Sequence, residues 1–585
     1  MRPAPSPASR TERLAALGDR TFDVLVVGGG ITGAGVALDA AARGLSVALV
    51  ERSDFAEGTS SRSTKLVHGG LRYLPMLDIG LVREDLVERG RLLRNAPHLV
   101  RPLPFVLPLY EGARRPLGLR LPSLLRPWLP LGLRCGLWVY DRLAAAGPAC
   151  GLPRHRRLSE DAAVLLVPPM RRRGLRSAYL YYDAAADDAR LTITVLRTAV
   201  SRGAVACNYA PVEEFVVERG RVTAAKVTDR VTGARLIVRA GVIVNATGVW
   251  ADAVAGLVAR PGFRLRRAKG VHLVVRAERL PMGRAAFVLP ETDDGRLAFV
   301  VPWQGAVLIG TTDTPWEGPP DVPAVDGGEV DYLLDHASRF LGAPLRRDDV
   351  LGVYAGLRPL VSASNDRSSA RISRRHEVVR AGPGLVTIVG GKLTSYRKMA
   401  EDAVNEALGQ RAGTASPTRD IPLDGAPPPA EGGEVWHEGR RAGLPRRTMV
   451  HLIRAYGARC RGLFEMIADR RALAEPLVPG QPHVAVEVVA AVRDEMALTV
   501  ADVLLRRTRL AHVLPRHGVE VAPRVARLMA EELGWSAEAE RRAVLEYEAV
   551  AASLAVPGFP RVGGPRETPC ATPRSPQEHR TGRAE

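Results

Sequence analysis

Three glycines at fixed spacing, followed by an acid, form the part of the sequence best suited to bind a nucleotide. Gly28, Gly30 and Gly33 follow an apolar run at 23–27 and precede a small-residue helix pattern that continues to residue 43. A second apolar run at 46–50 ends at Glu51. In such a strand, helix and strand unit, the glycines allow a tight turn, contact between backbone and pyrophosphate, and close helix packing. With Glu51 placed to bind a ribose, the pattern predicts a dinucleotide site.

A hydroxyl-rich segment directly after this unit favours a flavin as part of that dinucleotide. Residues 59–73 read Thr-Ser-Ser-Arg-Ser-Thr-Lys-Leu-Val-His-Gly-Gly-Leu-Arg-Tyr. Hydroxyls and backbone amides can bind the phosphate and ribitol oxygens of FAD. The alternative is a polar surface loop that caps a helix. We take Ser61, Lys65, His68 and Gly69 as candidate FAD ligands.

The order of motifs along residues 21–550 resembles the FAD-dependent, quinone-linked glycerol-3-phosphate dehydrogenase family. The likeness is carried by segment 59–73 and by further blocks: Asp187-Asp-Ala-Arg-Leu191, Asn245-Ala-Thr-Gly-Val-Trp250, Lys269-Gly-Val-His272, Ile309-Gly-Thr-Thr-Asp313, Tyr354-Ala-Gly-Leu-Arg-Pro-Leu360, Gly390-Gly-Lys-Leu-Thr-Ser-Tyr396 and Ala501-Asp-Val-Leu-Leu-Arg-Arg-Thr-Arg-Leu510. The resemblance implies oxidation of glycerol 3-phosphate to dihydroxyacetone phosphate by hydride transfer to FAD, with a membrane quinone as electron acceptor. The resemblance is also compatible with a homodimer.

Three other functions compete with this interpretation. An oxidase on the same scaffold would pass the electrons to oxygen, and the sequence separates oxidase from dehydrogenase poorly. An FAD amine or amino-acid oxidase would need a site for an amino acid's amine and carboxylate. A non-catalytic nucleotide-binding protein is the alternative of a different class.

The resemblance assigns roles to a small set of cations, one histidine and one tyrosine. Oxidising an alcohol beside a phosphate requires cations for the phosphate, a base for the hydroxyl proton and donors for the developing oxyanion. Arg358 and Arg374 are candidates for the phosphate, with Arg72 and Tyr73 beside them. His272 is the candidate base because the ordinary pKa of histidine lies near working pH. Lys392 follows Gly390 and Gly391 at a strand-to-helix turn, where it would lie near the substrate oxygen. Gly248 is a further candidate cofactor contact.

Composition agrees with a large enzyme that binds no metal. The chain has 585 residues, which is too long for one core and suits two or three domains. Its five cysteines are scattered and form no C-x-x-C pair, so we expect no metal site and a reducing compartment. The sequence shows neither a secretory signal nor an apolar run long enough to span a membrane.

A basic stretch predicts attachment to a membrane surface. Residues 101–176 carry 14 arginines against four acids within a chain of net charge +19. Leucines, Trp128, Trp138 and Tyr140 lie among these arginines, a combination that suits an anionic bilayer. The alternative is a solvated helical face over a core. No nucleic-acid-binding module accompanies the charge, so we expect no nucleic acid partner. We therefore expect a cytoplasmic protein attached peripherally to the inner face of the cytoplasmic membrane.

The sequence predicts an α/β FAD-binding Rossmann-like domain with an antiparallel-sheet substrate domain, plus a C-terminal α-helical domain. Residues 1–20 are expected to be disordered, and 21–412 to form the oxidoreductase region. Its FAD-binding segments are about 21–110, 180–260 and 350–412, with the substrate domain mainly at 261–375. A Pro/Gly-rich linker at 413–435, a helical domain at 436–555 and a disordered tail at 556–585 complete the prediction.

Overall fold

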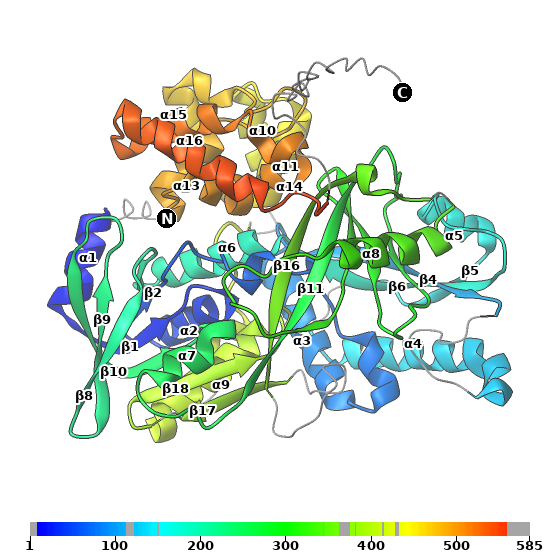
Figure 1. Cartoon of the computed structure of the whole chain (residues 1–585), viewed down its shortest axis with the longest axis horizontal. Helices are drawn as coiled ribbons and strands as arrows, with labels where there is room; N and C mark the ends of the chain where they lie inside the picture. The colour runs from blue at the N-terminus through cyan, green and yellow to red at the C-terminus, as the bar shows by residue number, and fades with distance from the viewer. Residues whose placement is uncertain are drawn as a thin grey trace, which may run out of the picture.

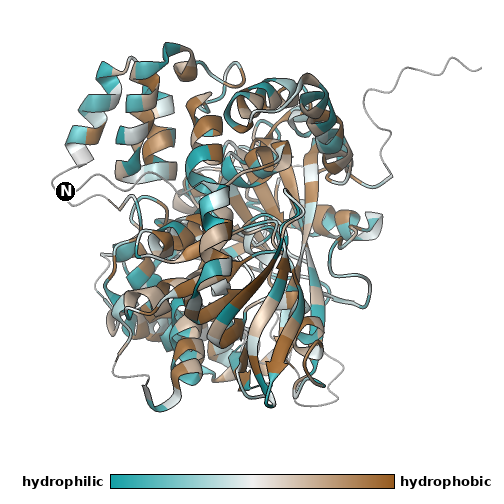
Figure 2. Ribbon diagram, turned by 90° about the vertical axis from the view of Figure 1, so that its left-hand side faces the viewer, coloured by the Kyte–Doolittle hydropathy of each residue, from teal (hydrophilic) through white to brown (hydrophobic). Residues whose placement is uncertain are grey.

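Two mixed β-sheets and a group of C-terminal helices make up the described part of the chain (Figure 1). The computed structural model describes residues 9–112, 122–148, 151–342, 344–361, 375–380, 382–411, 415–426 and 432–558. The C-terminal helices lie over one end of the body formed by the sheets (Figure 1). Apolar residues concentrate on the strands, whereas hydrophilic and hydrophobic residues alternate around the outer helices (Figure 2).

The first sheet is the nucleotide-binding type that the glycine motif predicts. Its main path runs β17-β18-β10-β1-β2-β7, and the neighbours from β18 to β7 are parallel. The strands of this path are β1 (Thr21–Val27), β2 (Val47–Val50), β7 (Val205–Cys207), β10 (Arg235–Asn245), β17 (His376–Arg380) and β18 (Leu385–Gly390). The hairpin of β8 (Val212–Glu218) and β9 (Arg221–Thr228) continues from β10. Most residues of β1, β2 and β18 are buried, because helices or strands cover both faces of a parallel sheet.

Three helices pack on this sheet and bring distant parts of the sequence together. They are α2 (Ile31–Ala42), α6 (Asp188–Val200) and α9 (Tyr396–Leu408). Gly35 of α2 lies so close to α9 that an added Cβ would meet the Tyr396 ring at 2.8 Å. The small residues of α2 therefore allow the close helix packing that the sequence predicts.

The second β-sheet provides the wall of a cavity that the first sheet lines from the opposite side. Within the described residues its path runs β15-β11-β14-β13-β12-β4-β6-β3, with β16 paired to β11 and β5 to β6. The strands are β3 (Leu66–Val67), β4 (Arg101–Tyr110), β5 (Arg156–Leu158), β6 (Leu175–Ala185), β11 (Leu265–Arg276), β12 (Ala286–Val288), β13 (Phe299–Trp303), β14 (Ala306–Gly310), β15 (Thr314–Trp316) and β16 (Val350–Val361). All their pairings are antiparallel except that of β12 with β4.

The remaining helices flank the sheets or form the C-terminal group. The flanking helices are α1 (Arg10–Asp19), α3 (Ile79–Asn95), α4 (Leu129–Ala145), α5 (Glu160–Leu166), α7 (Ala251–Gly256) and α8 (Gly327–Phe340), with the 3₁₀ segments η1 (Thr59–Ser61) and η2 (Leu71–Met76). The C-terminal group holds α10 (Gly432–Arg441), α11 (Arg446–Tyr456), α12 (Cys460–Asp469), α13 (Val486–Glu495), the π-helical turn η12 (Asp502–Arg507), α14 (Leu510–Val513), α15 (Ala522–Leu533) and α16 (Ala537–Ala552). This group has its own apolar core.

The structure differs from the predicted domain limits in three places. Residues 10–19, expected to be disordered, form α1, because Ser9 and Glu12 make a capping box and Leu17 is buried. Strands β4, β6 and β16, assigned in part to FAD-binding segments, belong to the second sheet. Inside the predicted linker, the Ser416 hydroxyl is buried against Asp39, and α10 begins at residue 432. Most of the predicted C-terminal tail lies outside the described residues.

Candidate active site

One cavity of about 1470 Å³ is lined by residues of both sheets. The carboxyl ends of β1, β2, β10 and β18 all reach it, through Gly28, Glu51, Gly248 and Gly390. In open sheets of this topology, ligands bind in the crevice outside the carboxyl ends of the strands. The cavity is therefore where the fold places a nucleotide.

The glycine turn after β1 provides a bare backbone surface at one end of this cavity. Gly28 has φ +110°, and an added Cβ would lie 2.8 Å from the Ala246 carbonyl oxygen. A Cβ on Gly33 would lie 1.8 Å from the Gly28 carbonyl oxygen, so Gly33 permits the helix to pack on the turn. Gly30 lines the cavity at the start of α2, where no side chain of its own caps the helix. The bare backbone at this N-terminus of α2 suits a pyrophosphate.

Glu51 and Ser60 surround this helix terminus. The Glu51 carboxylate accepts hydrogen bonds from the backbone amides of Gly29 at 2.6 Å and Ser53 at 2.9 Å. Burial raises the pKa of Glu51, and these two amides oppose that rise. The Ser60 hydroxyl accepts a hydrogen bond from the backbone amide of Ile31 at 2.9 Å. Both side chains line the cavity, so Glu51 occupies the position from which an acid binds a ribose.

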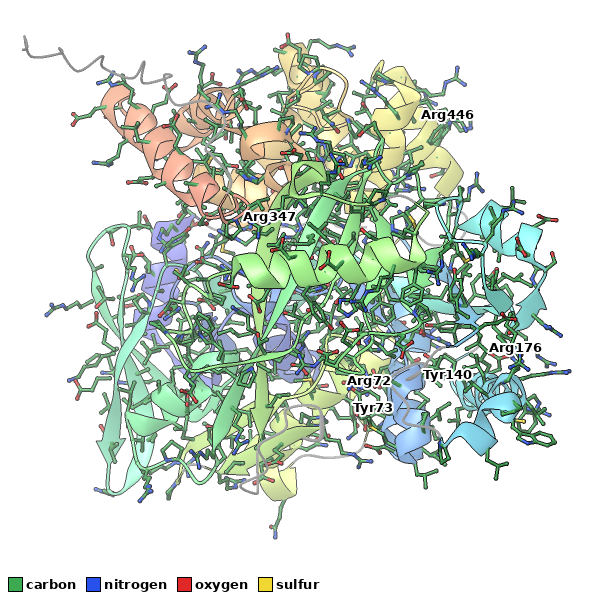
Figure 3. The ribbon with its side chains drawn as sticks, turned by 45° about the vertical axis from the view of Figure 1, so that its right-hand side comes forward. Arg72, Tyr73, Tyr140, Arg176, Arg347 and Arg446 are labelled. Carbon is green, nitrogen blue, oxygen red and sulfur yellow. The ribbon has the colours of Figure 1, made fainter. Side chains whose placement is uncertain are left out.

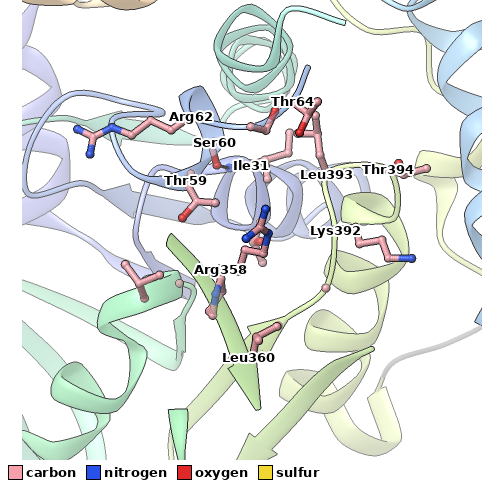
Figure 4. A pocket seen from close by; sticks show the side chains of 18 of the residues that line it. Ile31, Thr59, Ser60, Arg62, Thr64, Arg358, Leu360, Lys392, Leu393 and Thr394 are labelled. Carbon is pink, nitrogen blue, oxygen red and sulfur yellow. Dashed lines mark hydrogen bonds between the residues drawn. The ribbon is translucent and has the colours of Figure 1, made fainter. Parts of the chain in front are cut away.

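A second glycine turn, Gly390 and Gly391, reaches the cavity from β18. Gly391 has φ +82°, and an added Cβ would meet the sulfur of Met399 at 2.3 Å. Lys392 follows it and lines the cavity, together with Leu393 and Thr394 (Figure 4). The Thr394 hydroxyl accepts a hydrogen bond from the backbone amide of His68 at 3.1 Å. This bond joins the turn to segment 59–73.

Arg358 is the guanidinium that the second sheet contributes to the cavity wall (Figure 4). It lies on β16 and donates to the Asp313 carboxylate at 3.1 Å, to the Thr312 carbonyl at 3.2 Å and to the Thr311 hydroxyl at 3.1 Å. These contacts fix the guanidinium plane at the cavity, which suits bidentate recognition of a phosphate or carboxylate.

Arg72 and Tyr73 lie next to each other on η2 (Figure 3). The Arg72 guanidinium is 5.4 Å from the centre of the Tyr73 ring, and the Lys392 ammonium is 4.2 Å from the same centre. All three residues line the cavity. The structure thus brings Arg72, Tyr73, Arg358 and Lys392 to one cavity, whereas Arg374 lies outside the described residues.

His272 is the main departure from the predicted site. It is buried on β11 and is not among the cavity-lining residues, because Thr64 stands between them. Its Nε2 atom lies 2.9 Å from the Thr64 hydroxyl, and its ring stacks on Tyr354 with 4.9 Å between centres. Burial, followed by the charges of Lys65 and Arg358, lowers the pKa of His272 well below the usual value. The imidazole is therefore neutral at working pH and does not touch the cavity, contrary to its prediction as the base.

Three predicted FAD ligands in segment 59–73 also face away from the cavity. The Lys65 ammonium binds both oxygens of Asp188, at 2.8 and 2.9 Å, and the Ser61 carbonyl. Burial lowers the pKa of Lys65 to about 8, although Asp188 opposes that shift. The Gly69 amide donates to the Tyr140 hydroxyl at 2.9 Å. Ser61, Lys65 and Gly69 therefore support the segment from behind, while Thr59, Ser60, Arg62, Thr64 and His68 line the cavity.

Sequence reasoning missed several lining or supporting residues. Thr64 and Ser60 belong to the hydroxyl-rich segment, but nothing in its sequence separates them from Ser61 and Lys65, because the segment begins as a 3₁₀ turn and follows no strand alternation before β3. Asp313 lies in a recognised block but forms an ion pair with Arg358. Asp85 of α3 carries no sequence signal, because a charged residue in a helix usually faces solvent.

The cavity continues into an apolar arm between β4, η2 and α4. The lining side chains there include Leu71, Leu74, Phe105, Leu107, Leu129 and Leu133. At its outer end Trp128 both lines the cavity and is largely exposed. The arm can hold an apolar group with one end in the cavity and the other at the surface.

The chain is similar to known proteins along most of its length. A family model described as FAD dependent oxidoreductase matches residues 23–397, and a model described as the C-terminal domain of alpha-glycerophosphate oxidase matches 416–540. Glycerol-3-phosphate dehydrogenase 2 of Mycobacterium tuberculosis is 40% identical over 552 residues, which cover 93% of this chain and 90% of that protein. The mitochondrial glycerol-3-phosphate dehydrogenase of Macaca fascicularis is 36% identical, covering 90% of this chain and 73% of its own length.

A solved structure is similar along nearly the whole chain. The glycerol-3-phosphate dehydrogenase of Bacillus halodurans, complexed with FAD, matches with a TM-score of 0.76 and 30% identity. The match covers 95% of this chain and 99% of that one.

Proposed function

The chain belongs to the glycerol-3-phosphate dehydrogenases of the FAD-dependent oxidoreductase family, and from this premise we propose that it oxidises sn-glycerol 3-phosphate to dihydroxyacetone phosphate. FAD is the cofactor, and when bound it accepts the hydride from the alcohol carbon. The residues present fit this group: the N-terminus of α2 at Gly30, which lines the cavity without a side chain, suits the pyrophosphate, and Glu51 suits the ribose. The N-terminus of α9 with Gly390 and Gly391 suits the isoalloxazine. A helix terminus there would stabilise the negative charge that the ring carries when it is reduced.

The observation that carries the proposal is the convergence of Arg358, Arg72 and Lys392 on one cavity. Guanidinium groups bind a phosphate dianion through charge-assisted hydrogen bonds, and an ammonium can donate to the developing oxyanion. We assign phosphate binding to Arg358 and Arg72, with Arg374 as a further candidate. We assign the contact with the reacting oxygen to Lys392. Since His272 lies behind Thr64, we propose that it orients this hydroxyl.

The proposal is tested by anaerobic bleaching of the purified holoprotein. Addition of glycerol 3-phosphate should abolish the yellow flavin absorbance without oxygen, while glycerol and an amino acid such as glycine should leave it unchanged. Bleaching by an amino acid but not by glycerol 3-phosphate would favour the amine-oxidase alternative. A protein that carries no FAD after expression with riboflavin would contradict the assignment altogether.

We further propose that a membrane quinone takes the electrons. The apolar arm between β4, η2 and α4 supports this acceptor, because it suits an apolar molecule that enters from the surface. Oxygen is the alternative acceptor. Reduced enzyme should be reoxidised rapidly by a soluble ubiquinone analogue and slowly by air. Equal or faster reoxidation by air, with stoichiometric peroxide, would identify an oxidase.

Peripheral attachment to the inner face of the cytoplasmic membrane completes the proposal. Leu77, Leu124, Trp128, Leu131 and Trp138, on or near η2 and α4, each expose more than half of their surface. On the opposite side of α4, Leu133, Leu137 and Tyr140 are buried. No helix among the described residues is both long and apolar enough to cross a bilayer. An amphipathic helix of this kind, with Arg134 and Arg142 on it, suits the surface of an anionic bilayer.

A further inference from the structure

A buried carboxylate lies directly behind the lysine that reaches the cavity. Asp85 of α3 is fully buried, and its Oδ2 atom accepts a hydrogen bond from the Lys392 ammonium at 2.5 Å. Its other oxygen, Oδ1, is buried and makes no hydrogen bond of ordinary geometry among the described residues, although the Ser395 hydroxyl also interacts with the carboxylate. Lys392 therefore separates Asp85 from the cavity: its ammonium contacts the carboxylate on one side while the residue lines the cavity on the other.

The incomplete pairing of Asp85 contrasts with the next acid on the same face of α3. Glu88 accepts hydrogen bonds from Arg397 of α9 through both oxygens, each at 2.7 Å. A fully satisfied buried carboxylate of this kind is a structural ion pair. Asp85 instead forms an ion pair with one cation only among the described residues, Lys392, so that taking up a proton relieves part of the cost of its buried charge.

We propose that Asp85 is the positioning residue that receives, through Lys392, the hydroxyl proton released when the substrate alcohol is oxidised. The inference deepens the proposed function and rests on it. In the step, the alcohol C–H bond breaks and its hydrogen leaves with both electrons as hydride to FAD. The O–H bond breaks as the carbonyl forms. Its proton passes to the Lys392 nitrogen while one ammonium proton moves to Asp85 Oδ2, so that Lys392 ends as ammonium and Asp85 as a neutral acid.

The charges around Asp85 agree with this role. Burial raises the pKa of Asp85 from its ordinary 3.8 to about 6, against the charge and hydrogen bond of Lys392. Glu84, its neighbour on α3, also raises that pKa, and the Ser395 hydroxyl lowers it. Asp78, which pairs with Arg375, interacts with the charge of Lys392 as well. The Tyr73 ring covers the ammonium at 4.2 Å. Asp85 is therefore ionised at neutral pH, and its pKa of about 6 lies close enough to that pH for it to accept a proton.

The test compares Asp85→Asn with the wild type by single-turnover, anaerobic flavin reduction at saturating glycerol 3-phosphate. The limiting rate under these conditions reports groups in the enzyme–substrate complex. The substrate phosphate also titrates near pH 6, but it does so equally in both proteins. The ratio of wild-type to variant rate should therefore be about 10 or more at pH 8. It should fall towards unity below about pH 5, where Asp85 is protonated and can accept nothing.

Two further variants separate this role from a merely structural one. Glu88→Gln removes the buried ion pair between α3 and Arg397 of α9, one turn along α3 from Asp85, and its rate ratio should not change with pH. In a Lys392→Met background, adding Asp85→Asn should have no further effect on the reduction rate. An Asp85→Asn protein with a pH-independent ratio, or a full extra loss in the Lys392→Met background, would overturn the inference.

A stability measurement gives a readout that needs no turnover. Because the raised pKa makes the folded chain bind more protons than the unfolded chain, the contribution of Asp85 to stability is present in acid and lost as pH rises through about 6. The Tm of the wild type minus that of Asp85→Asn should fall between about pH 4 and 6 and then level off. A flat difference contradicts the inference. If glycerol 3-phosphate fails to bleach the wild type at all, the proposed function fails instead.

Discussion

Arg509 of the C-terminal helical group and Asp188 of α6 form an ion pair in which both side chains are buried. The same guanidinium contacts Asp187 at 3.2 Å and donates to the Ser61 carbonyl at 3.3 Å. Asp188 also binds Lys65 and the Ser63 hydroxyl. Although burial alone would raise it, the charges of Lys65 and Arg509 hold the pKa of Asp188 below its usual value. The C-terminal group therefore supports the segment whose other residues line the cavity.

Replacing Arg509 should destabilise the protein strongly. Arg509→Ala removes the ion pair of Asp187 and leaves the buried Asp188 carboxylate paired with Lys65. Removing one partner of a buried pair typically costs about 3–5 kcal/mol. We expect a large fall in Tm and easier loss of FAD on heating, both measured by flavin fluorescence. Arg470→Ala is the control, because the Arg470–Glu531 pair is exposed and worth about 1 kcal/mol or less. Similar Tm values for the two variants would contradict this account.

A side chain at Gly30 should prevent FAD binding. Gly30→Val places a branched side chain where the pyrophosphate must approach the start of α2, and its Cβ would lie 3.1 Å from the Ser60 hydroxyl. We expect colourless or insoluble protein, measured by the ratio of flavin to protein absorbance. Gly256→Ala is the control, since an added Cβ there meets nothing within 4 Å. A yellow, fully active Gly30→Val protein would refute the nucleotide assignment.

Arg358→Ala should weaken substrate binding and spare the cofactor. The variant removes a charge-assisted contact with a dianion, worth about 1.5–3 kcal/mol, so KM for glycerol 3-phosphate should rise about 10- to 100-fold. Steady-state kinetics with a soluble dye and the flavin content measure the two effects. The control is Arg267→Ala on the neighbouring strand, because Arg267 pairs with Asp252 and is absent from the cavity wall. An unchanged KM in Arg358→Ala would remove Arg358 from the phosphate site.

Lys392→Ala and His272→Ala should differ in how their effects depend on pH. Losing the group that contacts the reacting oxygen should cut flavin reduction about 10²-fold or more in Lys392→Ala. His272→Ala should also slow reduction, through Thr64, but the ratio of wild-type to variant rate should stay constant from pH 6 to 9. The reason is that the lowered pKa keeps this imidazole neutral throughout that range. A ratio that changes near pH 6.5 would restore His272 as a titrating base.

Membrane attachment should depend on the exposed apolar residues of α4 and of the short segment directly before it. Replacing Leu124, Leu131 and Trp138 by Ser removes three exposed anchors without touching the buried face of α4. Co-sedimentation with vesicles rich in phosphatidylglycerol should fall, and quinone-linked activity should fall more than dye-linked activity. Leu165→Ser, at an exposed residue of α5, should bind vesicles like the wild type. Unchanged binding of the triple variant would identify this face as an ordinary solvated surface.

The sequence by itself determined the parts of this protein that depend on local chemistry. The glycine turn at Gly28, Gly30 and Gly33 admits few backbone arrangements, so its strand, its helix and a dinucleotide site followed from spacing, whereas FAD followed from segment 59–73 and the family resemblance. Apolar alternation indicated a strand-rich second sheet, and helical periodicity indicated the C-terminal group. Lys392 was a candidate because it follows two glycines at a strand-to-helix turn in a block that resembles the family, and the resemblance implies a place near the substrate oxygen.

Only the tertiary structure decided which side chains share the cavity, because that depends on contacts between residues far apart in the chain. Segment 59–67 turns Thr64 towards the cavity and Lys65 towards Asp188, because the Lys65 backbone has φ +63° directly before β3 pairs with β6. His272 is buried on β11 and lies behind Thr64, whose hydroxyl is 2.9 Å from its Nε2 atom. Asp85 meets Lys392 across 307 residues of sequence, since α3 packs against the start of α9. No spacing rule encodes such a meeting, and burial then sets the chemistry of both residues.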